Sequence, residues 1–196
     1  MIDAADVFKV FQPHRGDAIV IPTGTSGRQW MNFTTNQKRD LTLGGAMGQT
    51  TAAALGVALA LPHEKVVLFD AEGALLMNLG ILATIAGMQP PNFYHFLLDN
   101  ECYATTGGQP VPNAKNINYA GMAKEAGYAA GYRFDKLEEF EHNVGSILRE
   151  KGPVFVAIKV VPAIENEPIG RRQRRPARSR AETIRDLQAE LGIRAG

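Results

Sequence analysis

The feature that most constrains this fold is the alternation of short β-branched runs with longer alanine- and leucine-rich runs along the chain. Such alternation is typical of an α/β domain built on a parallel sheet, with helices on both faces. In the last helix of the pattern, Asp135 and Glu138 form a capping pair at the start and Gly152 ends the helix. We predict strands at 18–21, 66–69, 93–98 and 154–161, and helices at 47–61, 74–86, 120–126 and 135–152.

Composition excludes several classes of protein. The 196 residues carry 21 Lys and Arg against 20 Asp and Glu, so the chain has no global charge to attract nucleic acid or anionic lipid. Cys102 is the single cysteine, which excludes a disulfide framework, a cysteine-ligated zinc site and an iron–sulfur cluster held by this chain alone. We expect a cytoplasmic protein, because no stretch reaches the roughly 20 apolar residues of a membrane span and no export signal is visible.

The tail changes character after Glu165. We expect the main domain at 1–168, followed at 169–196 by an arginine-rich linker and a short helix. Ser179 and Glu182 form a capping box ahead of the apolar stripe Ile184, Leu187 and Leu191. Three interpretations remain open: a solvated linker whose helix packs on its own domain, an element that docks on a partner or closes over an anionic substrate, and an RNA-binding segment. The absence of interleaved aromatic residues disfavours RNA.

Polar side chains follow two of the predicted strands where each strand ends. Glu72 lies just beyond one strand and Asn100 just beyond the next. Ligands bind at the carboxyl ends of parallel strands, and carboxylate, amide and carbonyl oxygens suit Mg²⁺ when a diphosphate completes its shell. Because such residues are common in α/β loops, a purely structural role for each one stays open. Glycines that allow a ligand close to the backbone are Gly44, Gly45, Gly48, Gly73, Gly107 and Gly108.

Four segments carry a resemblance to a known family. They are VVLFDAEGALLMNLG at 66–80, LLDNECYATTGGQ at 97–109, TGTSGR at 23–28 and GAMG at 45–48. The first two resemble the diphosphate-binding motif of thiamine-diphosphate enzymes, which runs from Gly-Asp-Gly to Asn at similar spacing. Together, over residues 17–161, they are similar to the cofactor-binding (beta) subunit of sulfopyruvate decarboxylases and to the C-terminal part of phosphonopyruvate decarboxylases.

This resemblance implies a thiamine-diphosphate-binding (PP-type) domain that holds the cofactor with Mg²⁺. It implies three metal ligands: Glu72 in the place of the family aspartate, the side-chain oxygen of Asn100 and the backbone carbonyl of Cys102. Met47 matches the apolar residue that keeps the cofactor bent, and the Gly45 carbonyl accepts a hydrogen bond from its aminopyrimidine. The implied cofactor-binding set is Gly45, Met47, Glu72, Gly73, Ala74, Asn100, Cys102 and Tyr103.

The chain departs from the family at the centre of the motif. Ala71-Glu72-Gly73-Ala74 stands where the family has Gly-Asp-Gly-Ser, so the carboxylate is one methylene longer and a serine hydroxyl is missing. Since Mg²⁺ tolerates little geometric change, three outcomes are open. Glu72 reaches a slightly displaced ion, Asp70 substitutes for it, or the chain binds cofactor weakly or not at all.

The resemblance further implies a subunit of a heteromeric 2-oxo acid decarboxylase that releases an aldehyde without oxidation. We assign no catalytic residue in this chain with certainty. The family's activating glutamate lies on a separate α/β domain, for which the length leaves no room, so we expect it on an alpha (pyrimidine-binding) partner subunit. We expect structural roles for Asn78, Gly80 and the four histidines, His14, His63, His95 and His142.

Three alternatives remain for the function. A carboligase or lyase subunit shares the same early chemistry with a decarboxylase, and the groups that separate them lie outside this chain. A 2-oxo acid:ferredoxin oxidoreductase subunit shares the Thr-Gly-Gly-Gln string, but one cysteine provides no cluster. A non-catalytic scaffold subunit with a degenerate cofactor motif is favoured by Ala71 and Ala74.

Overall fold

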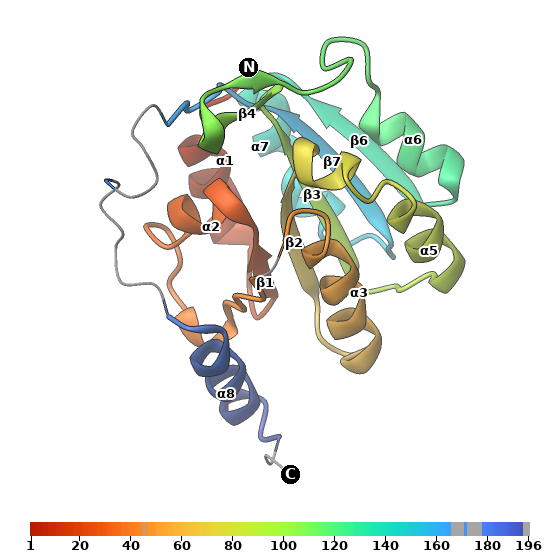
Figure 1. The fold of residues 1–196 in the computed structure, drawn as a ribbon. Coiled ribbons are helices and arrows are strands. Elements are labelled where there is room, and N and C mark those ends of the chain that lie inside the picture. Colours follow the sequence, from red (N-terminus) through yellow and green to blue (C-terminus); the bar gives the residue numbers. More distant parts are fainter. Residues whose placement is uncertain (45, 166–170, 172–177, 194–196) are drawn as a thin grey trace.

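The computed structural model describes residues 1–44, 46–165, 171 and 178–193. Within them, one parallel sheet has five strands in the order β1–β2–β3–β7–β6 (Figure 1). In register, Val66 pairs with Phe93 and Tyr94 with Val154, so β3 lies at the centre and its seven residues are all buried. The strands are β1 (Ile19–Pro22), β2 (Val66–Ala71), β3 (Phe93–Asp99), β6 (Ala130–Phe134) and β7 (Val154–Lys159).

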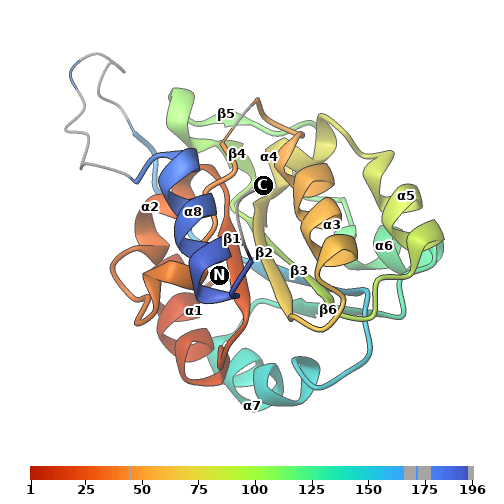
Figure 2. The same cartoon turned by 90° about the horizontal axis from the view of Figure 1, so that it is seen from below.

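Helices cover both faces of the sheet, which confirms the predicted fold class. The face with α1, α2 and α7 lies opposite the face with α3, α4, α5 and α6 (Figure 2). The first group is α1 (Ala4–Phe11), α2 (Gly24–Trp30) and α7 (Leu137–Ile147). The second is α3 (Thr50–Ala60), α4 (Glu72–Leu76), α5 (Ile81–Met88) and α6 (Tyr119–Ala126), and α8 (Arg180–Glu190) follows in the tail.

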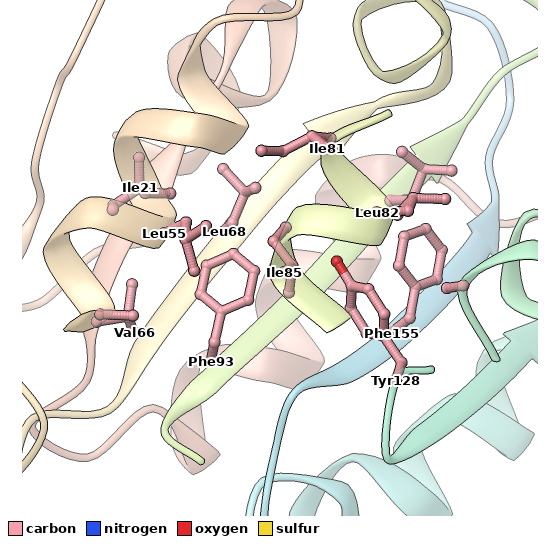
Figure 3. Close-up of a cluster of buried hydrophobic side chains, with 14 of the residues drawn as sticks. Ile21, Leu55, Val66, Leu68, Ile81, Leu82, Ile85, Phe93, Tyr128 and Phe155 are labelled. Atoms are coloured by element: carbon pink, nitrogen blue, oxygen red, sulfur yellow. The ribbon is translucent and has the colours of Figure 1, made fainter. Parts of the chain in front are cut away.

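The alternation of side chains along β2 builds two cores. Val66 and Leu68 point into the cluster under α3 and α5 (Figure 3), whereas Val67 and Phe69 join the opposite cluster with α1 and α2. The Phe69 ring lies edge-on to Phe8 and Phe11 with centroids 5.0 Å apart. Burying each large apolar side chain contributes roughly 1.5–3 kcal/mol, so the two cores fix the sheet that carries the loops at its carboxyl edge.

Several predicted elements are wrong in their extent. The helix expected at 74–86 is interrupted between α4 and α5, where the Asn78 side chain donates to the Gly48 carbonyl at 3.0 Å. The helix expected from 47 begins at Thr50. Lys136, and not Asp135, caps α7, and no side chain bonds to its first amides. These ends depend on contacts between loops, which the local pattern does not contain.

The sequence pattern did not predict α1, α2 and β6. Strand β6 is at the edge of the sheet and its burial alternates between half-buried and exposed positions up to Phe134, so it has no continuous apolar run. Between β3 and α6, β4 (Cys102–Tyr103) and β5 (Gln109–Pro110) form a small antiparallel pair. Among the described helices, none combines the length and apolar character needed to cross a bilayer.

Helix α8 packs on its own domain, beside the 3₁₀ helix η2 (Gln37–Arg39) at the β1 side of the molecule (Figure 2). The predicted capping box is present: the Glu182 amide donates to Ser179 Oγ at 3.2 Å, and the Ser179 amide donates to the Glu182 carboxylate at 2.6 Å. Leu187 is buried in the core, while Ile184 of the predicted stripe is exposed. The boundary expected at 168 and most of the arginine-rich linker lie outside the described residues.

Candidate cofactor site

A pocket opens at the carboxyl ends of β1, β2 and β3, where the sequence places the motif loops. It encloses about 740 Å³, its open mouth included. Seven of the eight predicted cofactor-binding residues line it: Met47, Glu72, Gly73, Ala74, Asn100, Cys102 and Tyr103. The eighth, Gly45, lies outside the described residues. The turn after β1 adds Thr23 and Gly24, and β2 adds Asp70 and Ala71.

Glu72 is the residue of this pocket with the most unusual environment. It is the first residue of α4, directly after β2, and only 1% of it is exposed. Neither of its carboxylate oxygens has a hydrogen-bond partner among the described residues. Burial raises the pKa of Glu72 to about 7 and the Asp99 charge adds to the rise, while nearby backbone amides oppose it. A buried carboxylate without partners is costly, and a cation bound there removes that cost.

Asn100 and Cys102 meet in a tight loop that follows β3. The Cys102 amide donates to Asn100 Oδ1 at 3.0 Å, and this bond fixes the Asn100 side chain with one lone pair of its oxygen still available. Burial raises the pKa of the Cys102 thiol, and the charges of Glu72 and Glu101 add to the effect. The thiol therefore stays protonated at neutral pH, which agrees with a role for Cys102 through its backbone.

Gly73 is required by the approach of an aromatic ring. A Cβ atom on Gly73 would lie 2.6 Å from Cε1 of Tyr103, closer than a real contact allows. The two motif segments therefore pack directly on each other, with the ring of Tyr103 over the backbone that follows Glu72. This contact brings the Glu72 turn and the Asn100 loop to the same side of the pocket.

Met47 and Gly48 form the wall contributed by the loop before α3. Met47 is 49% exposed and lines the pocket, so it is not a core residue buried at the start of a helix. Gly48 has φ +83, and a Cβ there would lie 3.2 Å from the Ala74 carbonyl oxygen. Together with the Asn78 bond to the Gly48 carbonyl, this close approach ties the Met47 loop to α4 and gives Asn78 the expected structural contact.

Asp70 also lines the pocket, but unlike Glu72 it has hydrogen-bond partners for both of its carboxylate oxygens. Its Oδ2 accepts from Thr51 Oγ1 at 2.7 Å and lies 3.1 Å from His95 Nε2, and its Oδ1 accepts from the Ala71 amide at 2.9 Å.

His95 is buried and its Nδ1 lies 3.3 Å from the Tyr128 hydroxyl, an environment that suits a structural role. The other histidines, His14, His63 and His142, are exposed and do not line the pocket.

Tyr119 and Lys159 do not line the pocket but lie next to the residues around it, and the sequence did not single them out. Tyr119 begins α6 and is buried, and its hydroxyl has no hydrogen-bond partner among the described residues. Burial and the charges of Asp99 and Glu72 raise the pKa of Tyr119. Lys159 ends β7 and pairs with Asp99. Both lie outside the motif strings, and no motif spacing could have indicated them.

The donor set fits a magnesium ion whose shell is shared with a diphosphate. Within the described residues, no group of three or more His, Cys, Asp or Glu side chains could hold a metal ion. The pocket instead offers one carboxylate, one amide oxygen and loop carbonyls, which are the hard ligands that Mg²⁺ takes together with phosphate oxygens. The arrangement can therefore hold a diphosphate–magnesium group but offers no cage for a metal ion alone.

Comparisons with known proteins agree with this geometry. Residues 23–158 match the C-terminal TPP-binding domain of thiamine pyrophosphate enzymes, and the chain belongs to this family. Sulfopyruvate decarboxylase subunit beta of Methanocaldococcus jannaschii is 34% identical over 130 residues, which cover 66% of this chain and 68% of the relative.

Phosphonopyruvate decarboxylase of Streptomyces viridochromogenes is 32% identical over 148 residues, 76% of this chain but 36% of the relative. The chain thus spans about a third of that enzyme. The solved structure of benzoylformate decarboxylase from Polynucleobacter necessarius superposes with a TM-score of 0.68 at 15% identity, covering 82% of this chain and 33% of that one. At this identity, the superposition supports the fold alone. The predicted resemblance is confirmed by these matches.

Proposed function

We propose that this chain is the thiamine-diphosphate-binding subunit of a heteromeric 2-oxo acid decarboxylase. The observation that carries the proposal is Glu72, whose buried carboxylate lacks hydrogen-bond partners among the described residues, in a pocket lined by the predicted cofactor residues. A diphosphate–magnesium group satisfies such a carboxylate. Membership of the thiamine pyrophosphate enzyme family supports the same ligand.

The chain's own residues bind and orient the cofactor. Glu72, the Asn100 side chain and the Cys102 carbonyl would hold Mg²⁺, and the turn at Gly73 and Ala74 would bring backbone groups to the diphosphate. The exposed Met47 side chain would support the cofactor rings, together with the Gly45 carbonyl. Thiamine diphosphate, when bound, supplies the electron sink that lets carbon dioxide leave a 2-oxo acid.

Similarity to proteins named sulfopyruvate decarboxylase subunit beta supports a partner subunit. We propose an alpha subunit that supplies the activating glutamate and the groups that decide the fate of the substrate. A sulfonate- or phosphonate-bearing 2-oxo acid is the substrate class these relatives suggest. A reducing, cytoplasmic location suits the free Cys102.

A scaffold subunit with a degenerate motif is the second candidate, because Ala71 and Ala74 replace family residues. Titration calorimetry with thiamine diphosphate in MgCl₂ separates the two. We expect Asn100→Ala to lose most of the affinity and Cys102→Ser, which keeps the backbone carbonyl, to retain it. Equal affinity in wild type and Asn100→Ala would overturn the metal assignment, and no binding by the wild type, with or without a partner, would favour the scaffold.

Activity tests the partner part of the proposal. Release of CO₂ from sulfopyruvate and phosphonopyruvate is measured with the purified chain, alone and with a candidate alpha subunit. We expect turnover only from the mixture. A rate from the isolated chain that the added subunit leaves unchanged contradicts the heteromeric assignment.

A further inference from the structure

Lys159 contacts the loop 99–102, which carries two of the proposed metal ligands, through both of its acidic side chains, Asp99 and Glu101. It is the last residue of β7 and is in register with Asp99 on β3. Its Nζ lies 2.8 Å from Asp99 Oδ2 and 2.8 Å from Glu101 Oε1. The side chains of Lys159 and Asp99 are 14% and 8% exposed, so this ion pair is shielded from solvent and is stronger than one on an open surface.

The segment that Lys159 contacts has a backbone that needs support. Glu101 has φ +66, the left-handed region that a residue with a side chain rarely adopts. It stands between Asn100 and Cys102, the two proposed ligands of this loop. Within the loop, the Glu101 amide donates to Asp99 Oδ1 at 3.3 Å and the Cys102 amide to Asn100 Oδ1 at 3.0 Å. Neither of these bonds holds the Glu101 side chain.

The Val111 amide donates to the Glu101 carbonyl at 3.0 Å, and Lys159 adds the contact that holds the Glu101 side chain from outside the loop. By binding Asp99 and Glu101 at once, it fixes the side chains on both sides of Asn100. The Val160 amide, next in the chain, donates to the Asp99 carbonyl at 2.9 Å, so the same strand end also holds the loop backbone. The loop conformation therefore depends on β7 as well as on its own hydrogen bonds.

Charge alone gives the opposite expectation for a lysine at this place. A positive group near a bound dication weakens binding by repulsion, so removing it strengthens binding if charge is all that matters. If the lysine instead orients the ligands, removing it weakens binding. The two roles therefore predict changes of opposite sign.

We propose that Lys159 is a positioning residue that sets the conformation of the loop 99–102, and with it the orientation of the Asn100 side chain and the Cys102 carbonyl toward magnesium diphosphate. The inference deepens the proposed function and rests on it for the identity of the ligand. The effect of Lys159 on the conformation of this loop concerns only this chain, and it can be measured without cofactor.

The test compares Lys159→Met and Lys159→Arg with wild type in the full-length chain. Lys115→Met is the matched control, because Lys115 is an exposed lysine whose charge also acts on Glu101. Hydrogen–deuterium exchange without cofactor reports the loop, and titration calorimetry with thiamine diphosphate in MgCl₂ reports the ligands. If a partner subunit is needed for binding, the titration uses the complex.

We expect Lys159→Met to speed exchange at 99–103 and to weaken magnesium-dependent binding about 10- to 100-fold, the usual effect of removing a group that orients a metal ligand. Lys159→Arg should restore most of both readouts, and Lys115→Met should change neither by more than about twofold. Unchanged exchange in Lys159→Met, or tighter binding, overturns the inference. If the wild type does not bind thiamine diphosphate, the proposed function is refuted instead. The exchange data then still decide whether Lys159 stabilises the conformation of the loop.

Discussion

Replacing Glu72 by glutamine keeps the size of the side chain and removes its charge, so it measures what burying this carboxylate costs the ligand-free chain. Burial raises the pKa of Glu72 from the ordinary value of 4.5 to about 7. Because the folded pKa lies above the unfolded one, the folded chain binds more protons between pH 4.5 and 7. The contribution of Glu72 to stability therefore falls as the pH rises through this window, and the full penalty is present above pH 7.

The size of the penalty follows from the pKa. A rise from 4.5 to about 7 corresponds to about 3 kcal/mol, since a tenfold change in proton affinity is worth about 1.4 kcal/mol. Burying an amide without partners has its own cost, but this cost does not depend on pH and cancels when two pH values are compared. We expect Glu72→Gln to raise the free energy of unfolding by about 2 to 3 kcal/mol more at pH 8 than at pH 5, relative to wild type at each pH.

Urea unfolding followed by tryptophan fluorescence measures this difference, because Trp30 is fully buried and is the single tryptophan of the chain. Glu125→Gln on the exposed surface of α6 is the control and should show no pH-dependent difference. In the presence of MgCl₂ and thiamine diphosphate, wild type should gain stability through binding, whereas Glu72→Gln should gain little. We therefore expect Glu72→Gln to stabilise the ligand-free chain and to weaken cofactor binding.

A variant that changes the free energy of unfolding equally at pH 5 and pH 8 would refute the reasoning, because it would show that the Glu72 carboxylate ionises in the fold as it does in water. A ligand-induced gain in Glu72→Gln equal to that of wild type would refute its role toward magnesium.

Three further substitutions test other parts of the structure. Gly73→Ala places a Cβ against the Tyr103 ring, so we expect at least a tenfold loss of thiamine diphosphate affinity by calorimetry; unchanged affinity would show that the ring moves without consequence. Tyr119→Phe removes a buried hydroxyl without a described partner and should stabilise the ligand-free chain or leave it within about 1 kcal/mol in urea unfolding; a larger loss would reveal a hydrogen bond. Leu187→Ala should lower the free energy of unfolding by about 2 kcal/mol and increase hydrogen exchange in α8, because Leu187 is the buried apolar side chain of that helix; unchanged exchange in α8 would show that the helix is held by its polar contacts.

The sequence by itself determined the parallel sheet and the edge at which the site lies. The buried strand β2 begins with the continuous apolar run Val66 to Phe69, and the alternation of such strands with helices leaves few topologies. Glu72 and Asn100 each follow a strand, so they had to meet at the carboxyl edge, and the motif strings indicated the cofactor class. Ser179 and Glu182 fixed the start of α8 because a capping box is local.

Only the tertiary structure decided which of the candidate groups are available. Asp70 and Glu72 are two residues apart and both are buried, yet Asp70 is bound by Thr51 and His95 while the Glu72 carboxylate has no described partner. Lys159 reaches Asp99 across 60 positions of sequence. Hydrogen bonding and desolvation depend on which distant segments pack together, and a local pattern of residues carries no record of those contacts.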